Sequence, residues 1–335
     1  MRAHVLRRYG RGRDIIDWVD IEPEPLGSDD VRIAVAAAGI NPVDVKTCEG
    51  EPKLILPRKP PFVLGVELAG RVMETGRDVT ALRVGDEVFA YGGMDRMGAF
   101  AESVVLPASR VAQRPGSMRA EEAACLPLAG LCALAALDAA GTTGGSRVLV
   151  HGGAGGVGSV AVQLASQLGA EVYATASKGD LDRVLALGAS RAIDRHAERF
   201  EDVAKEVDLV IDTVGGEVLG RSWRAVRRGG VVASLHVPPP AERLVEAGLR
   251  APWILRALLP IVTRGARAAA KRAGARLVPI LTLPSAEGLR RLSDAATQLG
   301  LQVGVGDVVA FDALGEALDR LVRPERKGRI VLRGA

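Results

Sequence analysis

The segment that most constrains the fold is RVLVHGGAGGVGSVAVQLASQLGAEVYATASK, residues 147–178. An apolar strand-like stretch runs into a G-x-G-x-x-G motif and then into a helix-like stretch with one apolar face. In this motif the first glycine permits a tight turn, the second lets the backbone approach a pyrophosphate, and the third lets the helix pack closely. The helix N-terminus then favours the bound anion. A purely structural glycine turn is the alternative, but the strand–turn–helix–strand context favours dinucleotide binding. The predicted cofactor-binding residues of the turn are Gly153, Ala154, Gly155, Gly156, Val157 and Gly158.

The end of the second strand indicates which dinucleotide binds. NAD sites usually place Asp or Glu there for the ribose 2′-hydroxyl, whereas this chain has Ser177 and Lys178. A hydroxyl and an ammonium attract a 2′-phosphate, which a carboxylate would repel. Asp180 lies just beyond, at a position typical of a helix N-cap. We therefore expect NADP(H) rather than NAD(H), the alternative being that Lys178 is only an exposed loop lysine.

Strand-like and helix-like segments alternate from residue 147 onward, which predicts a parallel sheet with helices on both faces. A helix rich in Ala and Leu is expected before them, over 121–141. The expected strands are 147–151, 171–175, 207–212 and 230–235, with 275–281 as a further candidate, and the expected helices are 156–168, 179–188 and 216–227.

Residues 1–120 instead show short alternating segments separated by turn residues, which is typical of a β-rich, partly antiparallel domain. The tail returns to strand, helix, strand and is expected to fold back onto this domain. The predicted fold class is therefore α/β, with a doubly wound parallel sheet inserted after a β-rich domain. The predicted domains are 1–123 plus 284–335, which would be catalytic, and 124–283, which would bind the dinucleotide.

Composition excludes several classes of protein. A net charge of +4 over 335 residues is too small to indicate nucleic-acid binding. The start of the chain lacks the apolar run of a signal peptide, and the longest apolar stretches are interrupted well before a membrane-spanning length, so we expect a cytoplasmic chain without membrane insertion. The cysteines (Cys48, Cys125 and Cys132) form neither a paired framework nor a CxxC motif.

Residues 247–286 contain seven basic residues and no Asp or Glu, interleaved with apolar residues. This pattern is typical of a basic amphipathic helix, which Pro260 is expected to break. A solvated helical face is one interpretation. The other is a docking surface for an acidic carrier protein.

Ordered motifs along nearly the whole chain resemble the zinc-free, quinone oxidoreductase-like branch of the medium-chain dehydrogenase/reductase superfamily. They are GINPVDVK (39–46), PFVLGVELAGRV (61–72), VGDEVFA (84–90), GAFAE (98–102), LPLAGLCAL (126–134), VHGGAGGVG (150–158), DTVGG (212–216) and KGRIVL (327–332). The resemblance implies a Rossmann domain for the parallel sheet, a GroES-like, partly open barrel for the β-rich domain, and a homodimer.

Zinc-dependent members of this superfamily carry a ligand Cys where this chain has Asn41, and a G-H-E motif where it has Gly65, Val66 and Glu67. Asparagine and valine supply neither thiolate nor imidazole, so no catalytic zinc is expected. The chemistry implied is hydride addition to a conjugated C=C (an enone or enoyl thioester) or to a quinone, where the cofactor carries the difficult step.

The resemblance also implies residue roles. Asn41 matches a position that borders the nicotinamide and substrate, and Lys46 stands where many relatives have an active-site tyrosine. Lys46 is a candidate hydrogen-bond or proton donor, or else a surface lysine. Arg195 matches a position that contacts the adenosine end of the cofactor. Four further cofactor-binding candidates follow the strands expected over 207–212 and 230–235: Thr213, Val214, Leu235 and His236.

The leading hypothesis is an NADPH-dependent, metal-independent oxidoreductase acting on a small-molecule enone, enoyl thioester or quinone. Two alternatives stay open at this point. One is an NADP(H)-binding scaffold that catalyses a non-redox cyclisation or isomerisation. The other is a binding protein that docks a partner through 247–286.

Overall fold

The computed structural model describes residues 1–321 and 328–334 of the chain. Lys327 of the KGRIVL motif therefore lies outside the described residues. The chain forms two compact units, and we describe each by itself. Unit 1 comprises 1–131, 245–250 and 283–335, and unit 2 comprises 132–244 and 251–282. Residues 124–131 and 245–250 thus group with unit 1, not with the predicted nucleotide-binding part.

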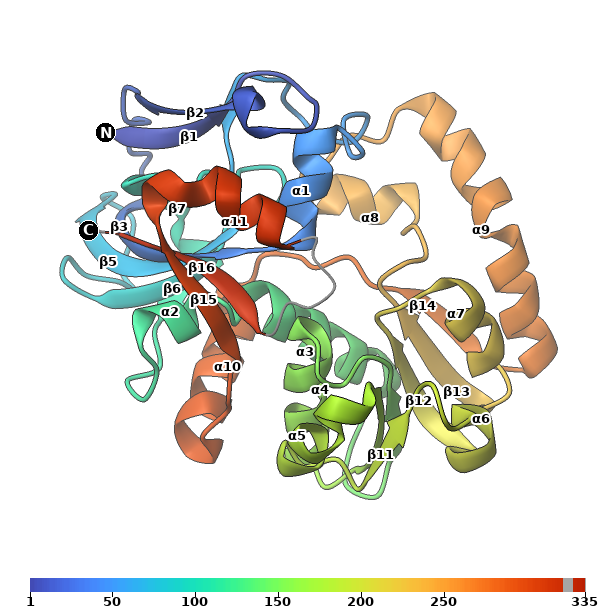
Figure 1. Cartoon of the computed structure of the whole chain (residues 1–335). Coiled ribbons are helices and arrows are strands. Elements are labelled where there is room, and N and C mark those ends of the chain that lie inside the picture. Colours follow the sequence, from blue (N-terminus) through green and yellow to red (C-terminus); the bar gives the residue numbers. More distant parts are fainter. Residues whose placement is uncertain (322–327, 335) are drawn as a thin grey trace. The chain divides into compact units, whose positions relative to one another are not determined.

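A six-stranded parallel sheet forms the centre of unit 2 (Figure 1). Its strands are β9 (Arg147–Val150), β10 (Glu171–Ala176), β11 (Arg191–Asp194), β12 (Val207–Asp212), β13 (Val226–Ser234) and β14 (Arg276–Pro279). Their spatial order is β11-β10-β9-β12-β13-β14, so the order reverses between β9 and β12. This is the doubly wound Rossmann arrangement, in which ligands bind at that reversal.

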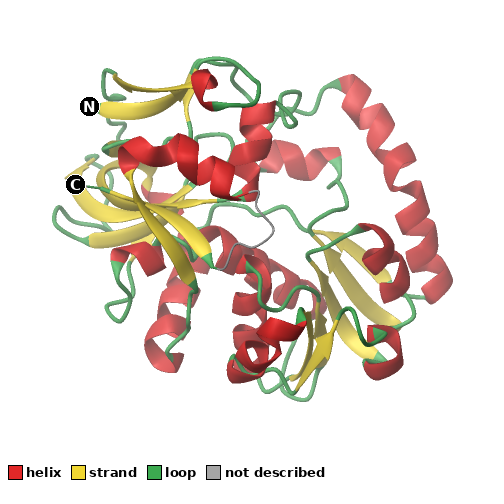
Figure 2. Cartoon of the chain, in the orientation of Figure 1, coloured by secondary structure: helices red, strands yellow, loops and turns green. Residues whose placement is uncertain are grey.

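Helices flank this sheet, as the helix–strand alternation predicts (Figure 2). Helices α4 and α5 contact β9, β10 and β11, whereas α7 and α9 contact β12, β13 and β14. From residue 127 to 273 the helices are α3 (Pro127–Ala140), α4 (Gly156–Gln167), α5 (Leu181–Ala186), α6 (Phe200–Val203), α7 (Gly216–Ser222), α8 (Ala241–Glu246) and α9 (Trp253–Ala273), with a 3-10 turn η3 at Lys178–Asp180.

Three local expectations are wrong. The helix expected over 121–141 is interrupted, because Pro127, which lacks an N–H group, starts a new helix there. Pro260 does not break the basic helix, since α9 runs through it and loses only the hydrogen bond that the proline nitrogen cannot donate. Strand β11 was not expected, because four residues bounded by Arg191 and Asp194 are too short and polar to show a periodicity.

Unit 1 is built mainly from antiparallel strands. Its larger sheet has the order β15-β16-β3-β5-β6-β8, with β7 paired to β3, and a smaller sheet has the order β2-β1-β4. The strands are β1 (Arg2–Leu6), β2 (Ile16–Asp20), β3 (Asp30–Ile40), β4 (Phe62–Val63), β5 (Glu67–Thr75), β6 (Glu87–Tyr91), β7 (Ser103–Pro107), β8 (Val111–Gln113), β15 (Val305–Ala310) and β16 (Arg329–Arg333). The helices are α1 (Pro42–Glu49), α2 (Ala120–Ala123), α10 (Ala286–Leu299) and α11 (Leu314–Leu321), with 3-10 turns η1 (Arg13–Ile15), η2 (Ala108–Arg110) and η4 (Phe311–Ala313).

The tail of the chain belongs to this larger sheet. Strand β16 pairs antiparallel with β3, with Ile330 opposite Ile40. This pairing confirms that the tail folds back onto the β-rich part and that the parallel sheet is inserted between them. No helix among the described residues combines the length and apolarity needed to cross a membrane.

Candidate active site

All the predicted cofactor-binding residues except Asn41 lie at one edge of the parallel sheet of unit 2. The glycine turn follows β9, Ser177 and Lys178 follow β10, and Arg195 follows β11. Thr213 and Val214 follow β12, and Leu235 and His236 follow β13. The carboxyl ends of parallel strands meet at one edge, which is where open α/β sheets bind ligands. Only Asn41 belongs to the other unit.

The glycine turn leaves helix α4 with an open N-terminus. Gly155 is its N-cap residue, has no capping side chain, and is exposed together with Gly156. The first hydrogen bond within the helix is donated by the Ser159 N–H to the Gly155 carbonyl. The N–H groups at the helix start therefore have no intrahelical acceptor, which makes them available to an anion.

Close packing explains why glycine is needed in this turn. A Cβ at Gly158 would lie 2.1 Å from the Gly152 carbonyl oxygen, and one at Gly153 would lie 2.8 Å from the Ala174 Cβ. The left-handed backbone of the turn falls at Gly152, with φ of 66°, one residue before the motif. The sequence pattern had assigned the tight turn to Gly153, so the strained position lies one residue earlier.

Two cations lie at the ends of adjacent strands. Lys178 and Arg195 are both exposed, and the Arg195 N–H donates to the Ala176 carbonyl at 3.0 Å, which joins the ends of β10 and β11. Within the described residues neither forms an ion pair with a carboxylate; Arg195 contacts only the His196 ring through Nε, at 3.1 Å. These charges therefore remain available to an anionic ligand.

Ser177 is less available than the sequence suggested. Its hydroxyl donates to the Asp180 carboxylate at 2.5 Å. Asp180 is the N-cap residue of α5, but its side chain makes no capping hydrogen bond. The carboxylate instead faces the same strand end as Lys178, where it partly offsets the positive charge.

Asp212, which the sequence reasoning missed, organises the turns after β12 and β13. It is fully buried, and one carboxylate oxygen accepts from Val214 N–H at 3.1 Å and Gly215 N–H at 2.8 Å. The other oxygen accepts from the Ser234 hydroxyl at 2.7 Å. The DTVGG stretch (212–216) quoted above is the sequence signal that could have pointed to it.

The predicted residues Thr213 and His236 lie together over these turns. The Thr213 hydroxyl donates to the His151 carbonyl at 2.7 Å, and the His236 Nε2 lies 2.9 Å from the Thr213 carbonyl. The ends of β9, β12 and β13 are thereby tied to one another. Val214 remains half exposed at this edge.

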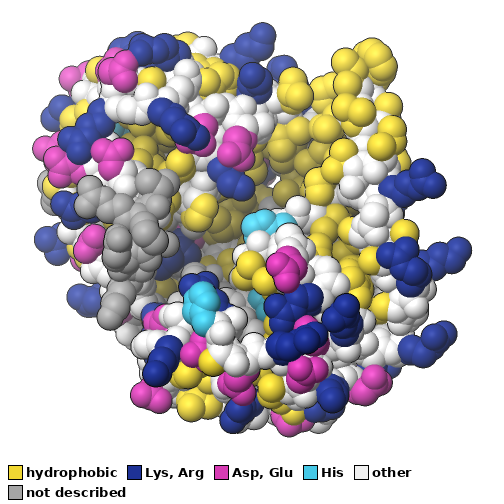
Figure 3. Space-filling view, turned by 45° about the vertical axis from the view of Figure 1, so that its right-hand side comes forward, with side chains coloured by type: hydrophobic (Ala, Val, Ile, Leu, Met, Phe, Trp, Pro, Cys, Tyr) yellow, Lys and Arg dark blue, Asp and Glu magenta, His cyan; other side chains and the backbone are white. Residues whose placement is uncertain are grey.

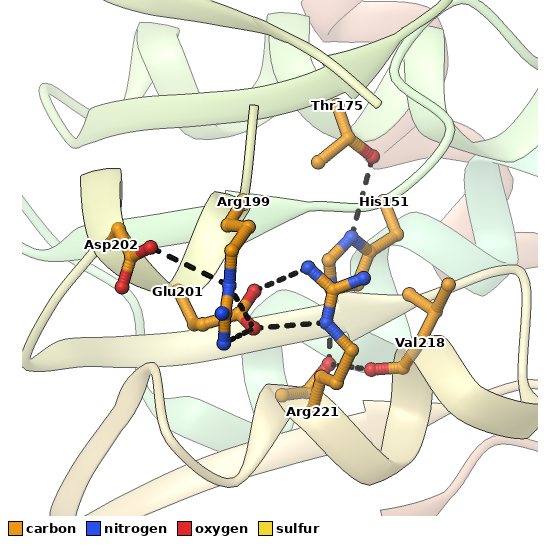
Figure 4. A network of polar contacts seen from close by, with 8 residues as sticks. His151, Thr175, Arg199, Glu201, Asp202, Val218 and Arg221 are labelled. Carbon is orange, nitrogen blue, oxygen red and sulfur yellow. Dashed lines mark hydrogen bonds and ion pairs between the residues drawn. The ribbon is translucent and has the colours of Figure 1, made fainter. Parts of the chain in front are cut away.

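The buried His151 follows β9 and precedes the glycine turn in the chain, and Figure 4 shows its polar contacts. The His151 Nε2 lies 3.0 Å from the Ser222 hydroxyl oxygen. The Ser222 hydroxyl donates its own proton to the Val218 carbonyl, so it can only accept from His151. Nε2 therefore carries the ring proton. Nδ1 then accepts from Thr175 at 3.3 Å, and Thr175 accepts from the Gly152 N–H at 3.2 Å. Burial lowers the pKa of His151 to about 4, which keeps the ring neutral.

An ion-pair cluster borders this histidine on the same unit (Figure 4). Arg221 holds the buried Glu201 with two bonds of 2.9 and 2.6 Å, and Arg199 adds a third at 3.1 Å. These hydrogen bonds, that of Arg221 first, lower the pKa of Glu201 to about 2. The Phe200 ring packs edge-on against His151, and the Arg221 guanidinium lies 4.7 Å from the centroid of the same ring. The ion-pair cluster therefore holds the side chains that surround His151.

In unit 1, Asn41 forms part of a buried polar network. Its Nδ2 donates to Glu67 at 2.8 Å and to the Gly39 carbonyl at 3.3 Å, and its Oδ1 accepts from Arg329 at 2.7 Å. Arg329 also forms an ion pair with Glu67. The remaining Glu67 oxygen accepts from the Leu128 N–H at 2.8 Å. The Asn41 side chain, only 3% exposed, is thus held in one orientation.

Asp44 closes this network at the start of α1. Its carboxylate accepts from the Asn41 N–H at 2.8 Å, at the third position of the helix. Burial is the main cause that raises the pKa of Asp44 to about 8; the Asn41 N–H opposes this rise, and the nearby Glu67 charge contributes to it. No local sequence pattern connects Asp44 to Glu67 or Arg329.

Lys46 lies on the exposed side of α1. Its side chain is 53% exposed, and Nζ lies 3.8 Å from the Glu51 carboxylate. It takes no part in the network around Asn41. Its proposed role as a donor therefore stays a prediction.

The zinc positions of the dehydrogenases hold different groups here. Val66 is buried and apolar, and Glu67 is engaged with Arg329 and Asn41. Within residues 1–321 and 328–334, no group of three or more His, Cys, Asp or Glu side chains is arranged to hold a metal ion.

Comparison with known proteins agrees with this architecture. The alcohol dehydrogenase GroES-like domain model matches residues 27–116, and the zinc-binding dehydrogenase model matches residues 156–249. The NADPH-dependent alkenal/one oxidoreductase of Arabidopsis thaliana chloroplasts is 32% identical, over 93% of this chain and 79% of that protein. The quinone oxidoreductase structure from Coxiella burnetii superposes with a TM-score of 0.82 at 31% identity, over 99% of each chain.

A GroES-like unit joined to a Rossmann sheet defines a protein of the dehydrogenase/reductase class. The chain belongs to the medium-chain dehydrogenase/reductase superfamily, in its quinone oxidoreductase-like branch. The 2-methylene-furan-3-one reductase of Solanum lycopersicum is 40% identical over 66% of this chain, but the match spans only 58% of that protein's length.

Proposed function

We propose that this chain is an NADPH-dependent, metal-independent reductase that transfers hydride to a conjugated C=C of an enone or enoyl thioester, or to a quinone. The observation that carries the proposal is the carboxyl edge of the parallel sheet. There an open helix N-terminus lies with two cations, which have no ion-pair partner among the described residues, and with the polar turns after β12 and β13. Two relatives support the reaction class: the Arabidopsis protein is an alkenal/one oxidoreductase, and the Coxiella protein is a quinone oxidoreductase.

The residues at this edge fit a phosphorylated dinucleotide. The N–H groups at the start of α4 suit the pyrophosphate, and Lys178 with Arg195 suits a 2′-phosphate. Asp180 favours NADH, so the choice of cofactor depends on two cations outweighing one carboxylate. When bound, the nicotinamide cofactor would supply the hydride. The protein binds and orients it through the turn and through the backbone held by Asp212.

Reduction of an enone leaves negative charge on the substrate oxygen and requires a proton at the α-carbon. With Val66 and Asn41 at the zinc-ligand positions, that charge requires a hydrogen-bond donor. We keep Lys46 as the proposed donor, because it is the strong cationic donor nearest to Asn41 in residues 39–50. Removing one donor of this kind costs about 2.7–4 kcal/mol, or roughly a hundred- to a thousandfold in turnover.

Substituting Lys46→Met tests this role. We expect kcat on an enone to fall by that factor while NADPH affinity stays within about twofold. Lys53→Met is the control, because it removes another lysine from the same region. Full turnover in Lys46→Met would show that solvent donates the proton and that Lys46 is a surface residue.

The reaction itself is tested by following NADPH absorbance with methyl vinyl ketone, crotonyl-coenzyme A and benzoquinone in turn. Deuterium from 4-deuterated NADPH should appear at the β-carbon of the reduced alkene. Binding of NADPH without consumption in the whole panel would favour the non-redox cyclisation or isomerisation reading. If the chain does not bind NADPH, the proposed function is wrong.

Three further expectations belong to this proposal. Strand β14 is an edge strand of the sheet, so its free side offers a place where a second copy could pair, consistent with a homodimer. A cytoplasmic location and docking of an acidic carrier protein at 247–286 also stay predictions. Light scattering of the purified chain tests whether it forms a homodimer.

A further inference from the structure

Helix α9 carries a stripe of exposed apolar side chains. Trp253 is 77% exposed, Ile261 68% and Val262 66%, and Ile254 and Leu258 are also about half exposed. The spacing of residues 254, 258 and 261 places them on one face of the helix. Leu259, Thr263 and Ala270 are buried on the opposite face, which packs on unit 2. The stripe therefore points away from the core of the unit.

Cations flank this stripe. Arg256, Arg264, Arg267 and Lys271 fall on one side of it by helical spacing, and all four are exposed. Arg256 lies 3.9 Å from Glu242 on α8, but the described residues offer no ion-pair partner to the other three. Figure 3 shows hydrophobic side chains gathered along α9 at the upper right, with Lys and Arg below them. Apolar surface and positive charge thus lie side by side along one helix.

An exposed stripe of this kind indicates an interaction surface. Scattered exposed apolar residues are normal, whereas contiguous patches rimmed by polar groups mark binding sites. At 21 residues, α9 is about 32 Å long, so it presents an extended face rather than a single anchor.

The positive charges along α9 indicate which kind of partner binds this exposed face. Residues 247–286 contain no acid, so stacking α9 on its equivalent in a second copy would bring like charges together. A soluble acidic protein would satisfy the cations but leave the aliphatic stripe without a function. An anionic bilayer meets both requirements, because aliphatic and Trp side chains enter below the headgroups while Lys and Arg stay at the phosphates.

We infer that α9 is a peripheral membrane-docking helix, which lies on an anionic lipid surface through Trp253, Ile254, Leu258 and Ile261. It lies along the surface and does not cross it, in keeping with the finding on membrane-spanning helices above. The inference uses α9 alone and does not depend on the reaction proposed for the carboxyl edge of the sheet.

Vesicle binding of the full chain tests the inference. We expect it to co-sediment with vesicles of three parts phosphatidylcholine and one part phosphatidylglycerol about tenfold or more tightly than with phosphatidylcholine alone. Added salt should weaken this binding. The fluorescence of Trp253 should shift to shorter wavelength on the anionic vesicles, and Trp253→Phe should abolish the shift.

Matched variants separate the apolar from the charged contribution. Leu258→Asp should weaken vesicle binding about tenfold, whereas Leu185→Asp, a helical leucine 45% exposed against 47% for Leu258, should not. Arg267→Glu should weaken it, whereas Arg224→Glu, with the same change in net charge at an exposed site outside α9, should have a smaller effect. Circular dichroism verifies that each variant is folded.

Three outcomes would overturn the inference. Wild-type chain that binds neither kind of vesicle rules out the lipid surface directly. An equal Trp253 shift with soluble poly-glutamate would assign the helix to an acidic macromolecule. Conversion of a dimer to a monomer by Leu258→Asp, without vesicle binding, would assign it to a contact between copies.

Discussion

We expect two side chains, Lys178 after β10 and Arg195 after β11, to govern the choice of cofactor. Lys178→Gln combined with Arg195→Gln should weaken NADPH binding about a hundredfold or more, because two charge-assisted contacts of roughly 1.5–3 kcal/mol each are removed. NADH binding should change little. Calorimetric titration with both cofactors measures the effect.

The control for this pair is Lys205→Gln, because Lys205 is an exposed lysine that precedes β12 and so lies at the opposite edge of the sheet. Asp180→Asn should act in the reverse direction and strengthen NADPH binding. Equal or tighter binding of NADH by the unmodified chain would defeat the assignment to NADP(H).

His151 makes the stability of unit 2 depend on pH. Its pKa is about 4 in the folded chain, against about 6.5 when unfolded, so the unfolded state binds more protons between these values. The stabilisation is fully present above pH 6.5 and is lost as pH falls toward 4, by about 3 kcal/mol in total. Urea unfolding of the wild type and of His151→Gln across this range should show a smaller pH dependence in the variant. If the free energy of unfolding depends on pH equally in both proteins, a group other than His151 causes the dependence.

At the scale of elements, the contact between the glycine turn and α4 leaves no room for a side chain. Gly158→Ala should lower the melting temperature and weaken NADPH binding, since its Cβ would lie 2.1 Å from the Gly152 carbonyl oxygen. Gly220→Ala is the matched control, because Gly220 is also helical but has open space around it. That change should raise stability by up to about 1 kcal/mol. Thermal unfolding and cofactor titration read out both effects.

Elements differ in how well the sequence predicted them. Strand-like and helix-like segments alternate clearly in 147–235, and the parallel sheet with flanking helices followed from that alternation. Strand β11 is short and polar, and its place in the sheet comes from pairing with β10 rather than from its own residues. Arg195, which follows β11, was named from the family resemblance without that strand, and its contact with the cofactor stays a prediction.

At the scale of the whole chain, the C-terminal strand contributes to the network around Asn41. Arg329 lies 288 residues from Asn41 and 262 from Glu67 along the chain, yet bonds to both. No local pattern predicts contacts at such separations. The individual residues Asn41 and Glu67 were recognised from motifs, but the network between them required the fold.

Breaking this network should destabilise unit 1. Arg329→Met leaves the buried Glu67 charge without its ion-pair partner, which costs about 3–5 kcal/mol. The double variant Arg329→Met/Glu67→Gln removes the stranded charge and should recover part of the loss. Urea denaturation measures the free energy of unfolding of both variants and of the wild type. If the single variant is as stable as the wild type, the ion pair contributes nothing to unit 1.

All three cysteines are buried, two of them in unit 1 and one, Cys132, in unit 2. Burial raises the pKa of both Cys48 and Cys125 to about 12, so the reactive thiolate is scarce in the native chain. A thiol reagent therefore modifies each site only when the surrounding structure opens. Mass spectrometry after pulsed alkylation would then time the opening of each unit separately, without an added label.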